Sequence, residues 1–480
     1  MDQTYPQHIM SSREWRGYSS EGHVFSNAEK IARSCNAEIP SAEMVKWSGS
    51  HDIMNACERG KRKVRDWTEE YQTRLEYEEG WSVGKGYPGY LFIVADLINE
   101  AKKSVLVGPA RGSSAGSLVC YLMGITETDP IVHELIFERF IDANRFDLPD
   151  IDIDFPDKKR DKVIKNLKKK YGDDKVMCLA TISRLQPRSA IGEFAKALGI
   201  PPYETDEVKN AIIERSSGDA RAAMCLQDTF ETTDAGKAFL EKYPQMRLVE
   251  RIEGHAHQSG KHAAGILVST LPLINYGSIT SRDETIMIDK KGAEELNLLK
   301  VDCLGLRTLS ILEGVAEQIG EPLCFYYDLP LDDAPTYELL DSLRLDGVFQ
   351  FEGQALQDVA RRMGVKSFED ISAITALARP GALSSGGTAR YVKYATGAEQ
   401  PRYYSEKHEE ITGGSYGIVI YQEQMMSVAR EIGGMSWAEV QTLRRASSKS
   451  LGDEFFSQYK EIFITGAEKN GYDEESREQL

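Results

Sequence analysis

The feature that most constrains the fold is an alternation of aspartates with apolar residues over positions 150–155. A period of two predicts a β-strand, in which successive side chains point to opposite faces. Asp150, Asp152 and Asp154 then share one face, with neighbouring aspartates roughly 6.5–7 Å apart. The apolar side chains share the other face, so the pattern predicts a strand with a buried back and a carboxylate-rich front.

Like charges on one strand face repel one another, and aspartate is a poor strand former. A divalent cation would compensate for this repulsion, because Mg²⁺ prefers oxygen ligands and keeps coordination positions open for phosphates. An exposed edge strand protected by its charges is the alternative explanation. The apolar backing and the strongly basic helix expected at residues 158–171, which Gly172 ends, favour a binding site. The lysines of that helix recur at helical spacing and so share one face. This face either contacts phosphates or is simply exposed to solvent.

A second strand is expected at residues 298–304, with Lys300 and Asp302 on one face and apolar residues on the other. An aspartate beside a lysine inside an apolar run costs free energy unless the pair has further partners. A structural ion pair and a contribution to the aspartate site both explain this pattern.

A glycine- and serine-rich loop at residues 108–117 follows a short β-prone run at 104–107 and precedes an expected helix at 118–123. Glycines let a backbone approach a phosphate closely, and N–H groups at the start of a helix attract anions. The loop is neither a Walker A nor a Rossmann motif. It is therefore either a phosphate-binding loop or a plain connection.

The composition narrows the class of protein. The 480 residues, 41% of them hydrophobic, are enough for about three domains. No apolar run approaches the ~18–20 residues that span a bilayer, and no signal peptide is recognised, so no membrane association is expected. The seven scattered cysteines form no CxxC pair, which indicates thiols in a reducing cytosol. The net charge of −17 argues against a protein coated in nucleic acid, although a basic groove can coexist with an acidic exterior.

Sequence patterns also predict the remaining elements. A helix is expected at residues 26–35 with Asn27 as its cap, a charged helix at 67–79, and a helix or strand at 91–98. Later segments are expected to be mainly helical at 181–258, strand-like at 264–268, 285–288 and 296–303, and mostly helical from 309, with loops at 379–381 and 413–414.

Together these segments resemble the C-family DNA polymerases, the family of the bacterial DNA polymerase III alpha subunit. The resemblance covers roughly residues 70–475 in colinear order. The segments similar to the palm of that family are 107–119, 137–140, 149–155, 261–265 and 300–308, and those similar to its fingers are 348–352, 379–381, 416–424 and 443–446.

The resemblance implies an α+β fold, with a polymerase beta-like nucleotidyltransferase palm, a helical thumb insertion and partial helical fingers. The implied domains are an N-terminal extension (1–69), a first palm segment (70–180), a thumb (181–258), a second palm segment (259–308) and incomplete fingers (309–480). The family normally has a PHP domain before the palm, and clamp-binding and OB regions after the fingers. We therefore expect a fragment or a split polymerase, with a second polypeptide supplying the remaining fingers and clamp-binding regions; a viral source is one explanation.

The resemblance also implies the residues of the site. The catalytic and metal-binding triad, holding two Mg²⁺ ions, falls on Asp150, Asp152 and Asp302, and Asp154 lies at a position that is usually acidic but outside the triad. The implied nucleotide-binding residues are Gly112, Ser113, Arg139, Arg145, Lys300, Arg444 and Arg445.

The implied function is template-directed DNA synthesis in replication, in a bacterial cytoplasm or a phage-infected cell. A nucleotidyl group passes from a dNTP to the 3′ hydroxyl of a primer on primer–template DNA. Two alternatives remain open: a template-independent nucleotidyltransferase and a non-catalytic scaffold derived from a polymerase. A polymerase adds nucleotides in the order that a template dictates, whereas a template-independent nucleotidyltransferase does not. The intact aspartate triad argues against a non-catalytic scaffold.

Overall fold

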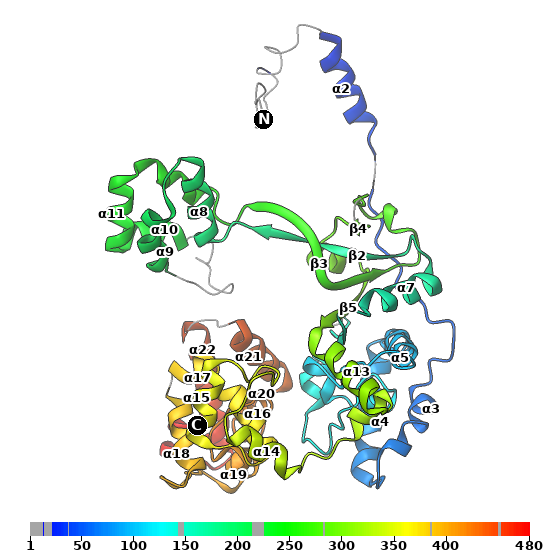
Figure 1. Ribbon diagram of the computed structural model, residues 1–480, viewed down its shortest axis with the longest axis vertical. Coiled ribbons are helices and arrows are strands. Elements are labelled where there is room, and N and C mark those ends of the chain that lie inside the picture. Colours follow the sequence, from blue (N-terminus) through cyan, green and yellow to red (C-terminus); the bar gives the residue numbers. More distant parts are fainter. Residues whose placement is uncertain are drawn as a thin grey trace.

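The computed structural model describes residues 13, 22–36, 38–142, 148–213, 225–281, 284–384, 386–449 and 453–480. These residues form one five-stranded mixed sheet and many helices, which confirms the expected α+β class. Figure 1 shows three bodies: helices gathered around the sheet, a small helical group at the end of a long two-stranded ribbon, and a larger helical body ending at the C-terminus. No helix in the described ranges is long and apolar enough to cross a membrane.

The sheet has the strand order β1-β5-β3-β2-β4. Strand β1 pairs in parallel with β5 and β2 with β4, whereas β3 is antiparallel to both β2 and β5. Buried and half-buried side chains alternate along β1 and β5, as the period of two predicts. The strands are β1 (Asp152–Pro156), β2 (Val176–Arg184), β3 (Ala256–Val268), β4 (Thr285–Ile286) and β5 (Leu299–Leu306).

The main hydrophobic core lies behind the carboxylate-bearing strands. The apolar side chains of β1 and β5 pack there with helices α4 (Glu69–Gly84), α5 (Pro88–Lys102) and α7 (Arg160–Tyr171). The apolar run at 91–98 is therefore part of a helix. Helix α7 buries Val163, Ile164 and Leu167 and turns its lysines outward, which explains why so basic a helix is tolerated.

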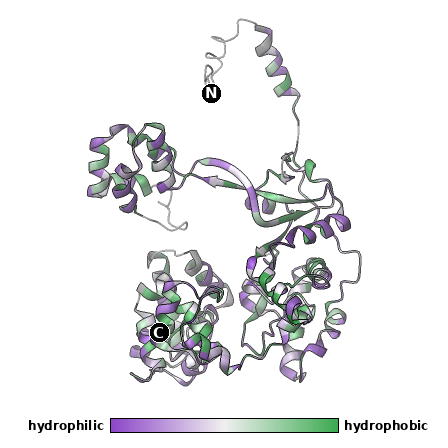
Figure 2. Ribbon diagram, viewed as in Figure 1, coloured by the Kyte–Doolittle hydropathy of each residue, from purple (hydrophilic) through white to green (hydrophobic). Residues whose placement is uncertain are grey.

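Strands β2 and β3 extend beyond the sheet as a ribbon that carries a separate helical group. The first residues of β3 are mostly exposed and its last five are buried, and Figure 2 shows the same change in hydropathy along the ribbon. The group has its own core, built around Ile191, Phe230 and Phe239. Its helices are α8 (Pro187–Ala197), α9 (Asp206–Asn210), α10 (Cys225–Thr232) and α11 (Asp234–Lys242).

The chain from residue 307 onward is mostly helical, as expected. Helix α13 (Arg307–Ile319) follows β5 directly and packs beside β1. The helices of the C-terminal body are α14 (Ala334–Asp341), α15 (Gln354–Met363), α16 (Phe368–Leu377), α17 (Pro380–Ser384), α18 (Gly387–Ala395), α19 (Glu406–Thr412), α20 (Gln422–Ser427), α21 (Trp437–Lys449), α22 (Asp453–Lys469) and α23 (Glu474–Gln479).

Three sequence predictions were wrong in detail. Helix α2 (Gly22–Ser34) contains Asn27 in its interior, so this residue does not cap it. The run at 104–107 is not a strand, because the amide of Leu106 bonds to the buried carboxylate of Glu313 at 2.8 Å instead of joining a ladder. The loop expected at 379–381 contains the start of α17, where proline is favoured as the first helical residue.

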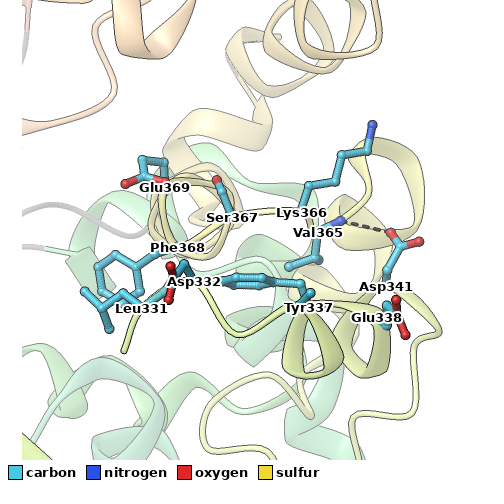
Figure 3. Close-up of a pocket in the computed structure, with 11 residues that line it drawn as sticks. Leu331, Asp332, Tyr337, Glu338, Asp341, Val365, Lys366, Ser367, Phe368 and Glu369 are labelled. Atoms are coloured by element: carbon cyan, nitrogen blue, oxygen red, sulfur yellow. Dashed lines mark hydrogen bonds between the residues drawn. The ribbon is translucent and has the colours of Figure 1, made fainter. Parts of the chain in front are cut away.

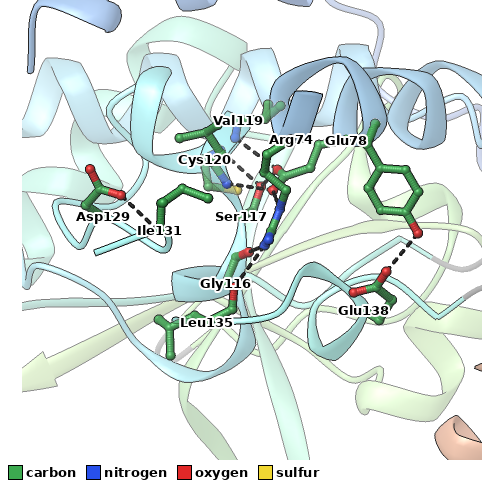
Figure 4. A network of polar contacts seen from close by, with 12 residues as sticks. Arg74, Glu78, Gly116, Ser117, Val119, Cys120, Asp129, Ile131, Leu135 and Glu138 are labelled. Carbon is green, nitrogen blue, oxygen red and sulfur yellow. Dashed lines mark hydrogen bonds and ion pairs between the residues drawn. The ribbon is translucent and has the colours of Figure 1, made fainter. Parts of the chain in front are cut away.

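One buried carboxylate fixes the end of the glycine–serine loop (Figure 4). Glu78 of α4 is fully buried and accepts hydrogen bonds from the amides of Leu118 (2.9 Å) and Val119 (3.0 Å). These amides begin helix α6 (Leu118–Leu122), which has no partners of its own to offer them. The Ser117 hydroxyl and the Arg74 guanidinium also donate to Glu78, at 2.8 and 2.7 Å. Burial raises the pKa of the Glu78 carboxyl, and Arg74 and the amide donors oppose this rise.

Replacement of Glu78 by alanine should destabilise the chain strongly. The change leaves Arg74 without its buried partner and the first amides of α6 unsatisfied. We expect a loss of about 3 kcal/mol in the free energy of unfolding, the usual cost of removing one member of a buried pair. Urea denaturation followed by circular dichroism measures this loss. Glu76→Ala, at an exposed position on the same helix, is the matched control and should cost less than about 0.5 kcal/mol; equal losses would contradict the role of Glu78.

Candidate functional site

The pairing of β1 with β5 brings two of the three predicted triad residues together. Asp152 and Asp302 are direct partners in the parallel register, so their backbones lie about 4.8 Å apart. Both side chains are half-buried and project from the face opposite the buried Ile153 and Cys303. Two residues far apart in the sequence thus form one acidic pair.

The third predicted aspartate, Asp150, is connected to this pair by the side chain of Lys300. Asp150 lies just before β1, and Tyr90 bonds to the carbonyl of the preceding residue at 2.9 Å. The Lys300 ammonium is bonded to Asp302 and lies 3.7 Å from Asp150 Oδ1. Lys290 lies 3.5 Å from Asp150 Oδ2 on the exposed side. The Lys300 ammonium therefore links two of the three carboxylates.

The electrostatics of the site follow from this crowding. Removal from water raises the pKa of the Asp152 carboxyl, and the charges of Asp302 and Asp150 raise it further, against the opposing charges of Lys300 and Arg111. Burial alone would lower the pKa of Lys300, but its bond to Asp302 and the other two carboxylates outweigh burial and raise that pKa. The site therefore has more negative charge than its own lysine neutralises.

One atom of the site fits a cation. Asp302 Oδ1 is buried and has no hydrogen-bond partner among the described residues, although a buried carboxylate oxygen without a partner is costly. The donor set is all oxygen, as Mg²⁺ prefers. In the stretches of the chain that the structure describes, however, no three Asp, Glu, His or Cys side chains are gathered as a ready metal cage. The aspartates thus fit a divalent ion by chemistry, while in this structure an ammonium lies among them.

The glycine–serine loop lies against the acidic pair. Its helical turn η2 (Gly112–Gly116) begins at Gly112, whose φ of +68° favours glycine. A Cβ at this position would lie 3.3 Å from Asp152 Oδ2, so the loop backbone approaches the carboxylate closely. Ser113 is half-buried beside it. Arg111 bonds to Asp154 at 3.1 Å, which keeps this fourth aspartate in an ion pair of its own.

The predicted arginines lie elsewhere, at a junction between the sheet body and the C-terminal helices. Arg139 bonds to Glu423 at 2.9 Å, and Arg445 pairs with Asp142. Arg444 donates to Gln441 at 2.9 Å. Arg145 lies outside the described residues. The structure therefore brings together Asp150, Asp152, Asp302, Lys300 and the loop, but not the arginines.

Sequence reasoning missed Lys290 and the contacts of Arg111 at this site. Arg111 belongs to the glycine–serine loop, and its position there was a signal that could have been used. Lys290 begins helix α12 (Lys290–Glu295), and no local pattern links it to Asp150.

A pocket of about 800 Å³ lies away from the aspartates, between helices α14 and α16 (Figure 3). Tyr337 and Phe368 line it together with Asp332, Glu338 and Glu369. Because the carboxylates outnumber its single lysine, this pocket disfavours a triphosphate or a nucleic acid. The aspartate site is therefore the better candidate for nucleotide chemistry.

Comparison with known proteins gives the chain its family. The family model described as the bacterial DNA polymerase III alpha NTPase domain matches residues 48–305, and the finger domain of the same subunit matches residues 308–471. Similar curated proteins named DNA polymerase III subunit alpha come from Staphylococcus epidermidis strain RP62A (33% identity, 100% of this chain, 46% of the relative), Halalkalibacterium halodurans (34%, 95%, 42%) and Aquifex aeolicus (36%, 89%, 39%).

The chain spans less than half the length of these curated relatives. Its NTPase match contains both aspartate strands and the glycine–serine loop, and its finger match contains most of the C-terminal helices. With one family model matching more than half of the chain, and with relatives above 30% identity along nearly all of it, the chain belongs to the family of bacterial DNA polymerase III alpha subunits.

Proposed function

We propose that this chain performs template-directed DNA synthesis, transferring a nucleotidyl group from a dNTP to the 3′ hydroxyl of a primer. The observation that carries this proposal is the direct pairing of Asp152 with Asp302, with the Gly112 backbone against Asp152. Family membership supports the substrates: primer–template DNA and dNTP.

Each group at the site then has a role. Asp150, Asp152 and Asp302 would hold two Mg²⁺ ions, which, when bound, acidify the primer hydroxyl and stabilise the pyrophosphate leaving group. Ser113 and the loop amides would bind the triphosphate, since exposed N–H groups attract anions. Lys300 would neutralise negative charge on the phosphate oxygens, because its ammonium is held within the site by Asp302.

The domain roles extend this proposal. The sheet body would be a polymerase beta-like palm, the ribbon-borne helices of residues 181–258 the thumb, and the C-terminal helices of residues 309–480 the fingers. Figure 1 draws the thumb and finger helices on the same side of the sheet body. We therefore expect primer–template DNA to run between these two helical bodies.

The role of Asp152 can be tested by Asp152→Asn. This change preserves the shape of the side chain and removes its charge. We expect primer extension to fall by roughly a hundredfold to a thousandfold or more, the scale for losing one preorganised charge-stabilising group. Primer–template binding, measured by gel shift, should be unchanged. Asp154→Asn, which removes a carboxylate already paired with Arg111, is the control and should keep most of the activity; near-normal extension by Asp152→Asn would disprove the triad assignment.

The raised pKa of Asp152 also predicts how stability depends on pH. Because the folded chain binds this proton more tightly than the unfolded chain, the contribution is favourable at low pH and is lost as the pH rises through the raised pKa. In the metal-free chain, Asp152→Asn should therefore show a smaller fall in melting temperature between about pH 4 and 7 than the wild type. Asp161→Asn, an exposed site on α7, should keep the wild-type fall. Parallel pH profiles for wild type and Asp152→Asn would contradict this prediction.

We also propose that this chain works together with a second polypeptide. The curated relatives are named as subunits, which supports an assembly of several chains. We expect the purified chain to extend a primed template weakly, and a protein that co-purifies with it from its source to restore robust synthesis. Fast processive extension by the chain alone would refute this proposal.

A further inference from the structure

Two reciprocal ion pairs join the sheet body to the C-terminal helices. Arg139, in the turn η3 (Phe137–Arg139), bonds to Glu423 of α20 at 2.9 Å. Arg445 of α21 pairs with Asp142, which follows η3 in the chain. Each body therefore contributes one arginine and one carboxylate. Both carboxylates are largely buried, with side-chain exposures of 18% for Glu423 and 10% for Asp142, so water screens them little.

The same junction has neutral contacts that do not depend on charge. Gln441 of α21 donates to the carbonyl of Glu138, and Ile136 packs against the apolar cluster of α20 and α21. The two bodies would thus stay in contact if an ion pair opened. A change of partner by either arginine would therefore leave the two bodies joined.

This junction adjoins the glycine–serine loop. A Cβ at Gly116 would lie 2.6 Å from the carbonyl oxygen of Ile136, so the end of the loop touches the start of η3. Arg74 ties the two segments together, donating to the carbonyls of Gly116 (2.7 Å) and Leu135 (3.0 Å). At its other end the loop approaches Asp152. A continuous series of contacts therefore connects the acidic pair with Arg139.

We propose that Glu423 and Asp142 are positioning residues that hold Arg139 and Arg445 in the nucleotide-free chain, and that a bound triphosphate takes these arginines from them. This inference rests on the proposed function. A triphosphate carries more negative charge than a carboxylate, and its oxygens accept hydrogen bonds from guanidinium groups as carboxylate oxygens do. Nucleotide binding would thereby loosen the junction and let the finger helices move relative to the palm.

The proposal predicts that the carboxylates weaken nucleotide binding. Only chains with the arginines released bind nucleotide fully, so the measured Kd is the intrinsic Kd divided by the released fraction. Glu423→Gln and Asp142→Asn should each lower the dNTP Kd by roughly threefold to tenfold. The Kd is measured by titrating dNTP, with Mg²⁺, into the full chain bound to primer–template whose primer ends in a dideoxynucleotide. Glu399→Gln, which removes a surface carboxylate paired with Lys393, is the control and should leave the Kd unchanged.

A double-mutant cycle separates this mechanism from a general effect of charge. If Glu423 acts through Arg139, Glu423→Gln should have no effect on Kd in an Arg139→Gln background. An equal effect in both backgrounds would mean that the lost negative charge acts directly on the nucleotide, which overturns the proposal. A raised Kd in Glu423→Gln would also overturn it, because the carboxylate would then be aiming the arginine at the nucleotide.

Hydrogen exchange gives a readout independent of affinity. In the ligand-free chain, Glu423→Gln should speed amide exchange in α20 and α21, and dNTP should produce the same change in the wild type. Wild-type nucleotide binding with unchanged exchange and unchanged Kd in the variants would overturn only this inference. A wild-type chain that binds no dNTP on primer–template would overturn the proposed function as well.

Discussion

The parallel pairing of β1 with β5 is the constraint on which the site depends. It sets Asp152 directly beside Asp302, in a place where both side chains are only partly hydrated. Burial raises the pKa of the Asp152 carboxyl, and repulsion from the Asp302 carboxylate raises it further. This repulsion is tolerated because Lys300, two residues before Asp302 on β5, bonds to Asp302. Strand pairing therefore concentrates negative charge at this point, and Lys300, on the same strand as Asp302, partly offsets it.

The surrounding fold keeps the glycine–serine loop against this charged pair. The loop carries few side chains that could anchor it, so its position depends on the groups at its ends. Glu78 and Arg74 of α4 bond to its C-terminal end, while Arg111 bonds to Asp154 at its N-terminal end. Helix α4 thus positions the loop from one end, and the backbone near Gly112 approaches Asp152 closely.

The sequence predicted most of strand β1 and helix α7 because both patterns are local: the burial of each side chain follows its own periodicity. The strand was expected to begin at Asp150 but begins at Asp152, so Asp150 lies just before it. The pairing of that strand with residues 299–306 is set by packing between distant segments, and only the family resemblance pointed to it. Leu106 is another case in which a distant contact overrides a local pattern. Its run is strand-like in sequence, but its amide bonds to the side chain of Glu313 and not to a neighbouring strand. The arginines were predicted from motifs, but their partners Glu423 and Asp142 belong to segments that no local rule connects.

The basic groups at the proposed site of this acidic chain are already paired in the absence of a ligand. The chain has 75 acidic and 58 basic residues, and each predicted basic group of the site that the structure describes already has an acceptor. An arginine in such a pair has lost most of its water before any ligand arrives. The proposed exchange of a carboxylate for a phosphate would therefore replace one ion pair by another and would avoid a second desolvation of the arginine. Under the proposed function, a ligand with several negative charges would compete with these carboxylates better than a singly charged anion, so the acidic residues would raise selectivity for nucleotides.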